Sequence, residues 1–76
     1  MVRHNNDYDD EKRRLGMRVS LLRASKGLSQ SQLAMMVEMH RPTLNLIESG
    51  QANPQFVTLV RIANGLGVKI EDLFKD

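Results

Sequence analysis

The sequence predicts an all-α fold, and three observations support that prediction. Apolar residues recur at the 3.6-residue spacing of helices along the 76-residue chain. No stretch alternates apolar and polar residues as a half-buried strand does. Glycine, proline and serine stand between the periodic stretches, where helices begin or end. These patterns together indicate five helical segments.

The first segment is expected to run from about Asp9 or Asp10, either of which can cap it, to Ser25. Gly27 then ends it, because glycine tolerates the left-handed turn after a helix. Three apolar residues fall at i, i+4 and i+7 of one helical face: Leu15, Val19 and Leu22. This segment is therefore an amphipathic helix with one buried stripe.

The second and third segments are short and lie close together. Ser29 is the expected cap of the second, with Gln32 completing a capping-box pattern. A break without glycine follows at residues 38–40, and the third helix is expected over Arg41 to Glu48, with Pro42 in its first turn. The expected buried residues of the two segments are Leu33, Ala34, Val37, Leu44 and Ile47.

The fourth segment is expected from about Gln55 to Asn64, closed by Gly65 and Gly67, and a last short helix near Ile70 to Phe74. The apolar stripe of the fourth segment consists of Leu59, Ile62, Ala63 and Leu66. Apolar residues for a dimer contact gather toward the C-terminus, although some of them must fill the core: Val60, Val68, Ile70, Leu73 and Phe74.

Composition argues against an enzyme. The chain has no cysteine, which excludes disulfides and thiolate zinc sites, and its two histidines, His4 and His40, match no ligand spacing. It has no glycine-rich phosphate loop, and a domain of this size offers little room for a substrate pocket. We therefore expect no catalytic residue, no metal, no cofactor and no small-molecule ligand.

Charge is unevenly distributed. Acidic residues collect at the two ends, while basic residues dominate residues 12–61, which fits either a polyanion-binding surface or a solvated helix face. Residues 1–10 are expected to form a polar arm and residues 11–76 the folded domain. No signal peptide, transit peptide or membrane-spanning run is recognisable, so we expect a cytoplasmic protein without a membrane partner.

Two short helices joined by a tight break have the layout of a helix-turn-helix, whose second helix enters the major groove of DNA. Residues 27–34, GLSQSQLA, resemble the "GLSQxxLA" signature of the phage-repressor and Cro-like helix-turn-helix family, the XRE-type transcriptional regulators. Residues 43–50, TLNLIESG, are similar to its "TISxIExG". The resemblance extends over about residues 15–74. It implies a five-helix, lambda-repressor-like domain that binds specific duplex DNA as a homodimer on a two-fold symmetric operator.

The same resemblance implies roles for individual residues. Gln30 matches a position that contacts a DNA phosphate and steadies a base-reading side chain. Arg23 and Glu48 match a structural ion pair between the first helix and the end of the third. Gln55 matches a position that contacts the DNA backbone or minor groove. Apart from the resemblance, Arg18 is a candidate for a phosphate contact because it is basic, although it could equally be a solvated charge.

The outward side of the third helix is the expected reading surface. Arg41 matches a base-contacting position and can donate two hydrogen bonds to guanine. Thr43 and Asn45 are expected to reach a base or a phosphate. Pro42 and Leu46 also match contact positions but are apolar. They can pack on thymine methyl groups, or they can suit a protein partner.

Departures from the family pattern keep a second function open. Glu38 stands where the family usually has glycine, and His40 and Lys69 replace the usual helix caps. These changes predict strain or widening of the turn and weaker helix starts. The alternative function is an antitoxin or another protein-interaction module of the same fold, with a toxin as the possible partner.

Overall fold

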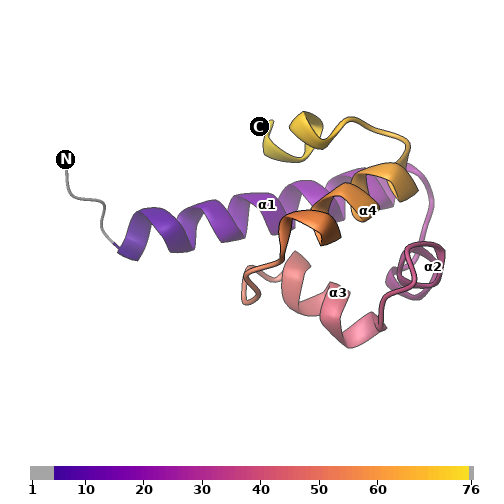
Figure 1. Ribbon diagram of the computed structural model, residues 1–76, viewed down its shortest axis with the longest axis horizontal. Coiled ribbons are helices and arrows are strands. Elements are labelled where there is room, and N and C mark those ends of the chain that lie inside the picture. Colours follow the sequence, from indigo (N-terminus) through magenta and orange to yellow (C-terminus); the bar gives the residue numbers. More distant parts are fainter. Residues whose placement is uncertain (1–4, 76) are drawn as a thin grey trace.

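The computed structural model describes residues 5–75, and these residues contain four α-helices, a 3-10 segment and no strand (Figure 1). The elements are α1 (Asn5–Ser25), α2 (Gln30–Met36), α3 (Arg41–Glu48), α4 (Phe56–Leu66) and η1 (Ile70–Phe74). The all-α prediction is confirmed. The count of five α-helices is not, because the last segment is a 3-10 turn of five residues.

Helix α1 begins at Asn5, so the expected start at Asp9 or Asp10 was wrong. Both aspartates lie inside the helix, where Asp9 is within 3.6 Å of Lys12 one turn later. Such i, i+3 pairs of opposite charge stabilise the first turns of α1, in which no described side chain belongs to the core before Leu15. The helix therefore includes residues 5–10 of the expected arm, and the division into arm and domain stays a prediction.

The core lies where the apolar stripes of all the elements meet. Its buried residues are Leu15, Val19, Leu33, Ala34, Val37, Leu44, Ile47, Leu59, Ile62, Ala63, Leu66 and Leu73. Each large side chain in such a core contributes about 1.5–3 kcal/mol by leaving water. Of the apolar stripes expected from periodicity, only Leu22 is partly rather than fully buried. Periodicity thus predicted the buried faces of all four α-helices.

The C-terminal end of α4 differs from the prediction. The helix continues to Leu66 and ends at Gly67, which adopts the left-handed conformation with φ 70°. Gly65 does not close the helix. It lies within α4 and packs against Val37, the C-cap residue of α2. A Cβ at Gly65 would stand 2.5 Å from Cγ1 of Val37. Glycine at this position therefore permits close helix packing instead of ending the helix.

Helix α1 is the long axis of the molecule, with η1 packed on one side of it and α3 on the other (Figure 1). Leu73 of η1 is fully buried and fills the core, so it is not available for a dimer contact, whereas its neighbour Phe74 is 57% exposed. No helix in the described part of the chain combines the length and the apolar character needed to cross a lipid bilayer.

Candidate nucleic-acid interface

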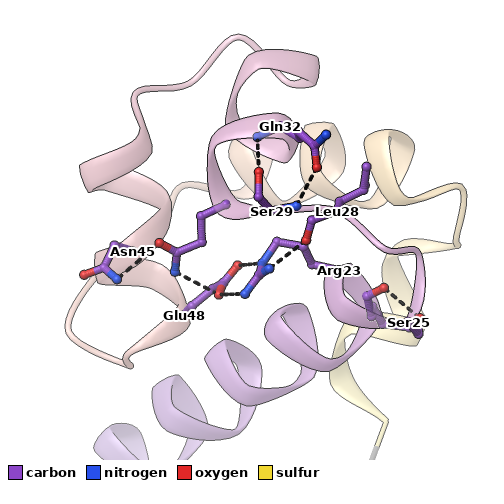
Figure 2. A network of polar contacts seen from close by, with 9 residues as sticks. Arg23, Ser25, Leu28, Ser29, Gln32, Asn45 and Glu48 are labelled. Atoms are coloured by element: carbon purple, nitrogen blue, oxygen red, sulfur yellow. Dashed lines mark hydrogen bonds and ion pairs between the residues drawn. The ribbon is translucent and has the colours of Figure 1, made fainter.

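Helix α2 begins with the predicted capping box. The hydroxyl of Ser29 accepts a hydrogen bond from the backbone N–H of Gln32 at 3.0 Å, and the Gln32 side chain accepts one from the Ser29 N–H at 2.8 Å (Figure 2). Two N–H groups that the helix cannot satisfy are thereby paired. This reciprocal contact defines where α2 starts although the helix has only seven residues.

The turn between α2 and α3 is tight and holds a non-glycine residue in the left-handed region. Glu38 has φ 57°, its N–H donates to Met35 O at 3.3 Å, and Met39 N–H donates to Ala34 O at 2.8 Å. This pair of bonds is the Schellman arrangement, which usually has glycine at the left-handed position. The expected strain is therefore present at Glu38, and the turn is not widened.

Helix α3 starts without a side-chain cap. His40 occupies the cap position and its side chain makes no capping hydrogen bond, while its carbonyl oxygen accepts from the N–H groups of Thr43 and Leu44. The weak cap expected from the sequence is confirmed. Pro42 compensates in part, because its fixed φ suits the first turn and its missing N–H leaves one fewer donor unpaired.

Helix α3 has one buried and one exposed side. Leu44 and Ile47 are almost fully buried, at 0% and 2% exposure. The residues of α3 proposed from the sequence as DNA contacts are all exposed: Arg41, Pro42, Thr43, Asn45 and Leu46. The helix thus presents a basic residue, two hydrogen-bonding residues and two apolar residues to solvent. Contact of these residues with DNA stays a prediction.

An ion pair ties the end of α3 to α1 and to the α1–α2 connection. Arg23 donates from Nε to Glu48 Oε2 at 2.7 Å and from Nη2 to Oε1 at 2.9 Å, a two-bond geometry (Figure 2). Its Nη1 also donates to Leu28 O at 2.7 Å. The hydrogen bonds that Arg23 donates to Glu48 raise the pKa of Arg23 above its ordinary value. The pairing agrees with the structural role implied by the resemblance.

Gln30 lies between this ion pair and the exposed side of α3. Its Nε2 donates to Glu48 Oε1 at 3.1 Å, and its Oε1 accepts from Asn45 Nδ2 at 3.4 Å. The structure therefore brings two of the predicted site residues, Gln30 and Asn45, into contact with each other. The resemblance implied that Gln30 steadies a base-reading side chain, but no pattern in the sequence named Asn45 as that side chain, because fifteen residues separate the two.

Gly16 is a residue that sequence reasoning missed. It is buried in the middle of α1, against the backbone carbonyls of Ile47 and Glu48 at the end of α3. A glycine inside an otherwise regular helix costs stability relative to alanine, which was the available signal that the position has a packing role. Gly16 allows α3 to approach α1 closely and so positions the exposed side of α3.

The structure does not bring Arg18 to the exposed side of α3. Its Nε donates to the carbonyl oxygen of Asp72 at 2.8 Å, which places the guanidinium beside η1, across α1 from α3. Gln55 is the N-cap residue of α4, and its exposed side chain makes no capping hydrogen bond. The Gln55 side chain therefore does not cap its helix and is open to solvent, whereas the Arg18 side chain links α1 to η1.

The basic residues in the N-terminal half of α1 have acidic neighbours. Arg13 pairs with Asp10, and Arg14 lies 3.8 Å from Glu11. All four side chains are more than half exposed. Of the two interpretations of this basic run, the solvated helix face therefore accounts for it better than a polyanion-binding surface.

Comparison with known proteins agrees with this geometry. A family model described as helix-turn-helix matches residues 19–73. Control protein C.MunI of a Mycoplasma species is 36% identical over 69 residues, which cover 90% of this chain and 93% of that protein. An uncharacterized HTH-type transcriptional regulator of Archaeoglobus fulgidus is 37% identical over 57 residues, or 75% of this chain and 81% of that one.

Solved structures with the same fold include the restriction-modification controller protein C.AhdI from Aeromonas hydrophila. It superposes with a TM-score of 0.84 and 32% sequence identity, covering 86% of this chain and 98% of that one. The hypothetical transcription factor NHTF from Neisseria superposes with a TM-score of 0.82 at 26% identity, covering 86% of this chain and 75% of that one.

Proposed function

Since this chain belongs to the helix-turn-helix family of DNA-binding transcriptional regulators, we propose that it acts as a homodimer on a two-fold symmetric operator. One observation carries the proposal: the Arg23–Glu48 pair anchors the end of α3 to α1, while the other side of α3 is exposed. A helix presented in this way fits the major groove of B-DNA.

Within this proposal, Arg41 at the leading end of α3 reads guanine through O6 and N7. Thr43 and Asn45 follow on the same exposed side and contact a base or a phosphate. Pro42 and Leu46 pack against thymine methyl groups, which are the apolar feature of the major groove. The reading surface is therefore mixed, with one strong hydrogen-bond donor and an apolar component.

Contacts to the DNA backbone come from residues beside α3. Gln30 in the first turn of α2 and Gln55 at the cap of α4 are the proposed phosphate contacts. Arg18 is left out, because its guanidinium is engaged with η1. Phosphate contacts of this kind set the position of the protein on the duplex, and the base contacts of α3 then select the sequence.

We propose further that the regulated genes belong to a restriction–modification system. C.MunI and C.AhdI support this assignment because each matches over more than nine-tenths of its own length. A regulator of this kind binds cytoplasmic DNA, which agrees with the location expected from the sequence.

Selection of bound sites from a randomised duplex library tests the proposal. The expected result is a palindromic site whose half-sites are centred about one helical turn, roughly 10 base pairs, apart. Affinity should fall steeply as salt rises, because phosphate contacts release counterions. Sedimentation of the complex should show two protein chains per site. A protein without salt-sensitive binding to any duplex in the pool contradicts the proposal.

The exposure of two apolar residues on α3 favours a second candidate, a protein-binding module such as an antitoxin. Leu46 is 44% exposed and lies beside the exposed ring of Pro42. If a protein covers this face, Leu46→Asp should abolish binding of that partner, and the protein should bind no duplex selectively. Selective DNA binding that survives addition of the partner would contradict a role limited to protein capture.

A further inference from the structure

Four polar side chains form a continuous chain of hydrogen bonds from the interior side of α3 to its exposed side. The chain runs from Arg23 through Glu48 and Gln30 to Asn45, with the first three side chains partly buried and Asn45 exposed (Figure 2). The inner end of this series of hydrogen bonds is the structural ion pair. The outer end, Asn45, lies on the proposed reading surface. Each hydrogen bond in the series has a defined donor and a defined acceptor.

The direction follows from the donors and acceptors. A carboxylate only accepts hydrogen bonds, and Glu48, which is 6% exposed, already accepts two from Arg23. Gln30 must therefore turn its NH2 group toward Glu48, which it does at 3.1 Å. The carbonyl oxygen of the Gln30 amide then points away from Glu48 and toward α3.

The orientation of the Gln30 amide in turn determines the orientation of the Asn45 amide. The Gln30 Oε1 is an acceptor, so Asn45 turns its NH2 group inward to donate to it at 3.4 Å. The Oδ1 of Asn45 and its second N–H are left for a ligand. If the Gln30 amide were reversed, Asn45 would turn its oxygen inward and present NH2 instead.

We propose that Glu48, acting through Gln30, fixes the Asn45 amide so that Asn45 presents an acceptor beside a donor and selects adenine in the major groove. This inference rests on the proposed function, and it names Glu48 as the residue that orients Gln30 and, through Gln30, a base-reading side chain.

Adenine is the base whose edge matches that pair of groups. Its N6 amino group donates to the Asn45 Oδ1, and its N7 accepts the free N–H of the same amide. Guanine offers acceptors at both O6 and N7, which leaves the Asn45 Oδ1 facing another oxygen. A bidentate contact of this kind discriminates by about 5- to 150-fold against the wrong base.

Glu48→Gln is the decisive variant, because it keeps the shape of the side chain and changes its hydrogen bonding. The new amide can place its oxygen at either position, because the oxygen that Gln30 contacts, Oε1, also accepts from Arg23 Nη2. Gln30 then faces either an oxygen or an NH2 group and is no longer held in one orientation, and the same follows for Asn45. Site selection with this variant should weaken the adenine preference at one position in each half-site and admit a base with a major-groove acceptor, such as guanine.

Three further variants separate positioning from stability. Asn45→Ala identifies the base pair concerned by the loss of preference there. Gln30→Met breaks the chain and should broaden the preference at that position alone. Arg23→Lys weakens the ion pair but leaves a carboxylate at Glu48, so it should lower the melting temperature and keep the preference for adenine.

The possible results discriminate clearly. If Glu48→Gln folds and keeps the adenine preference unchanged, the inference is overturned. If Glu48→Gln does not fold, an unchanged adenine preference in Gln30→Met overturns it instead. The proposed function fails separately, if the wild type selects no site. In the free protein, the side-chain amide NMR signals of Asn45 should shift in Gln30→Met, and unchanged signals overturn the inference without reference to DNA.

Discussion

Gly16 of α1 lies directly against the backbone of Glu48 at the end of α3, with no side chain between them. A Cβ at Gly16 would stand 2.5 Å from the Glu48 carbonyl oxygen and 2.8 Å from its carbonyl carbon, closer than such atoms can approach. The two helices therefore touch backbone to backbone. This contact and the ion pair of the Glu48 side chain with Arg23 together determine how α3 is presented.

Gly16→Ala should destabilise the protein by about 1–3 kcal/mol, the usual cost of overpacking, although alanine is the better helix former. The backbone oxygens it would meet cannot rotate away. Gly65→Ala is the matched comparison, because its Cβ would meet a methyl group of Val37 rather than backbone. Urea unfolding should give the larger loss for Gly16→Ala. Equal losses would show that α1 and α3 can separate without cost.

Glu38→Gly should stabilise the protein by about 1 kcal/mol. Glycine removes the Cβ conflict of the left-handed conformation at φ 57°, and its greater freedom in the unfolded chain offsets part of the gain. Glu38→Ala removes the charge and keeps the Cβ, so it serves as the control and should bring no gain. Thermal unfolding of the three proteins measures the difference, and an equal gain in both variants would assign the effect to charge.

Arg23→Met should cost about 3 kcal/mol, because it leaves the Glu48 carboxylate in a largely buried place without its main partner. The double variant Arg23→Met, Glu48→Leu should recover part of the loss. Arg13→Met is the control, since Arg13 and its partner Asp10 are both exposed and such pairs contribute at most about 1 kcal/mol. Urea unfolding of the wild type, these three variants and Glu48→Leu alone measures the differences. A loss in the double variant equal to the sum of the losses in Arg23→Met and Glu48→Leu would contradict this account.

Asp72→Asn should lower stability more at neutral pH than in acid. Asp72 accepts hydrogen bonds from Lys75 Nζ at 2.7 Å and from the Lys69 N–H at 3.0 Å, and these contacts, that of Lys75 foremost, lower the pKa of Asp72. A lowered pKa contributes stability above the ordinary value of about 3.9, and the contribution is lost as pH falls through the value in the folded protein.

Melting temperatures at pH 7 and pH 3 check this expectation. The gap between the wild type and Asp72→Asn should narrow at the lower pH. Glu71→Gln, which removes a neighbouring exposed charge, is the control and should show a smaller gap at pH 7. A gap for Asp72→Asn that is independent of pH would rule out the carboxylate as its source.

Arg41→Ala should lower operator affinity by about 1–3 kcal/mol and relax the preference at one base pair of each half-site. Arg61→Ala removes another exposed positive charge, from α4, and should change the affinity little and by a similar factor for every sequence. Titration of variant duplexes by fluorescence anisotropy distinguishes the two. An unchanged preference in Arg41→Ala would remove this residue from the reading surface.

Local sequence determined the helices, most of their boundaries and their buried sides, because apolar spacing and capping residues act within one or two turns of chain. The capping box of Ser29 and Gln32, the buried pair Leu44 and Ile47, and the exposed side of α3 were all predictable for this reason. The family motif added the pairing of Arg23 with Glu48, which no local pattern contains.

Only the tertiary structure decided which side chains from different helices meet. The placement of Arg18 beside η1, the backbone contact of Gly16 and the hydrogen bond between Gln30 and Asn45 all depend on the angles at which helices cross. Those angles result from packing between residues that are far apart in the chain. Spacing along one helix states which side faces inward, but it does not state which neighbour lies there.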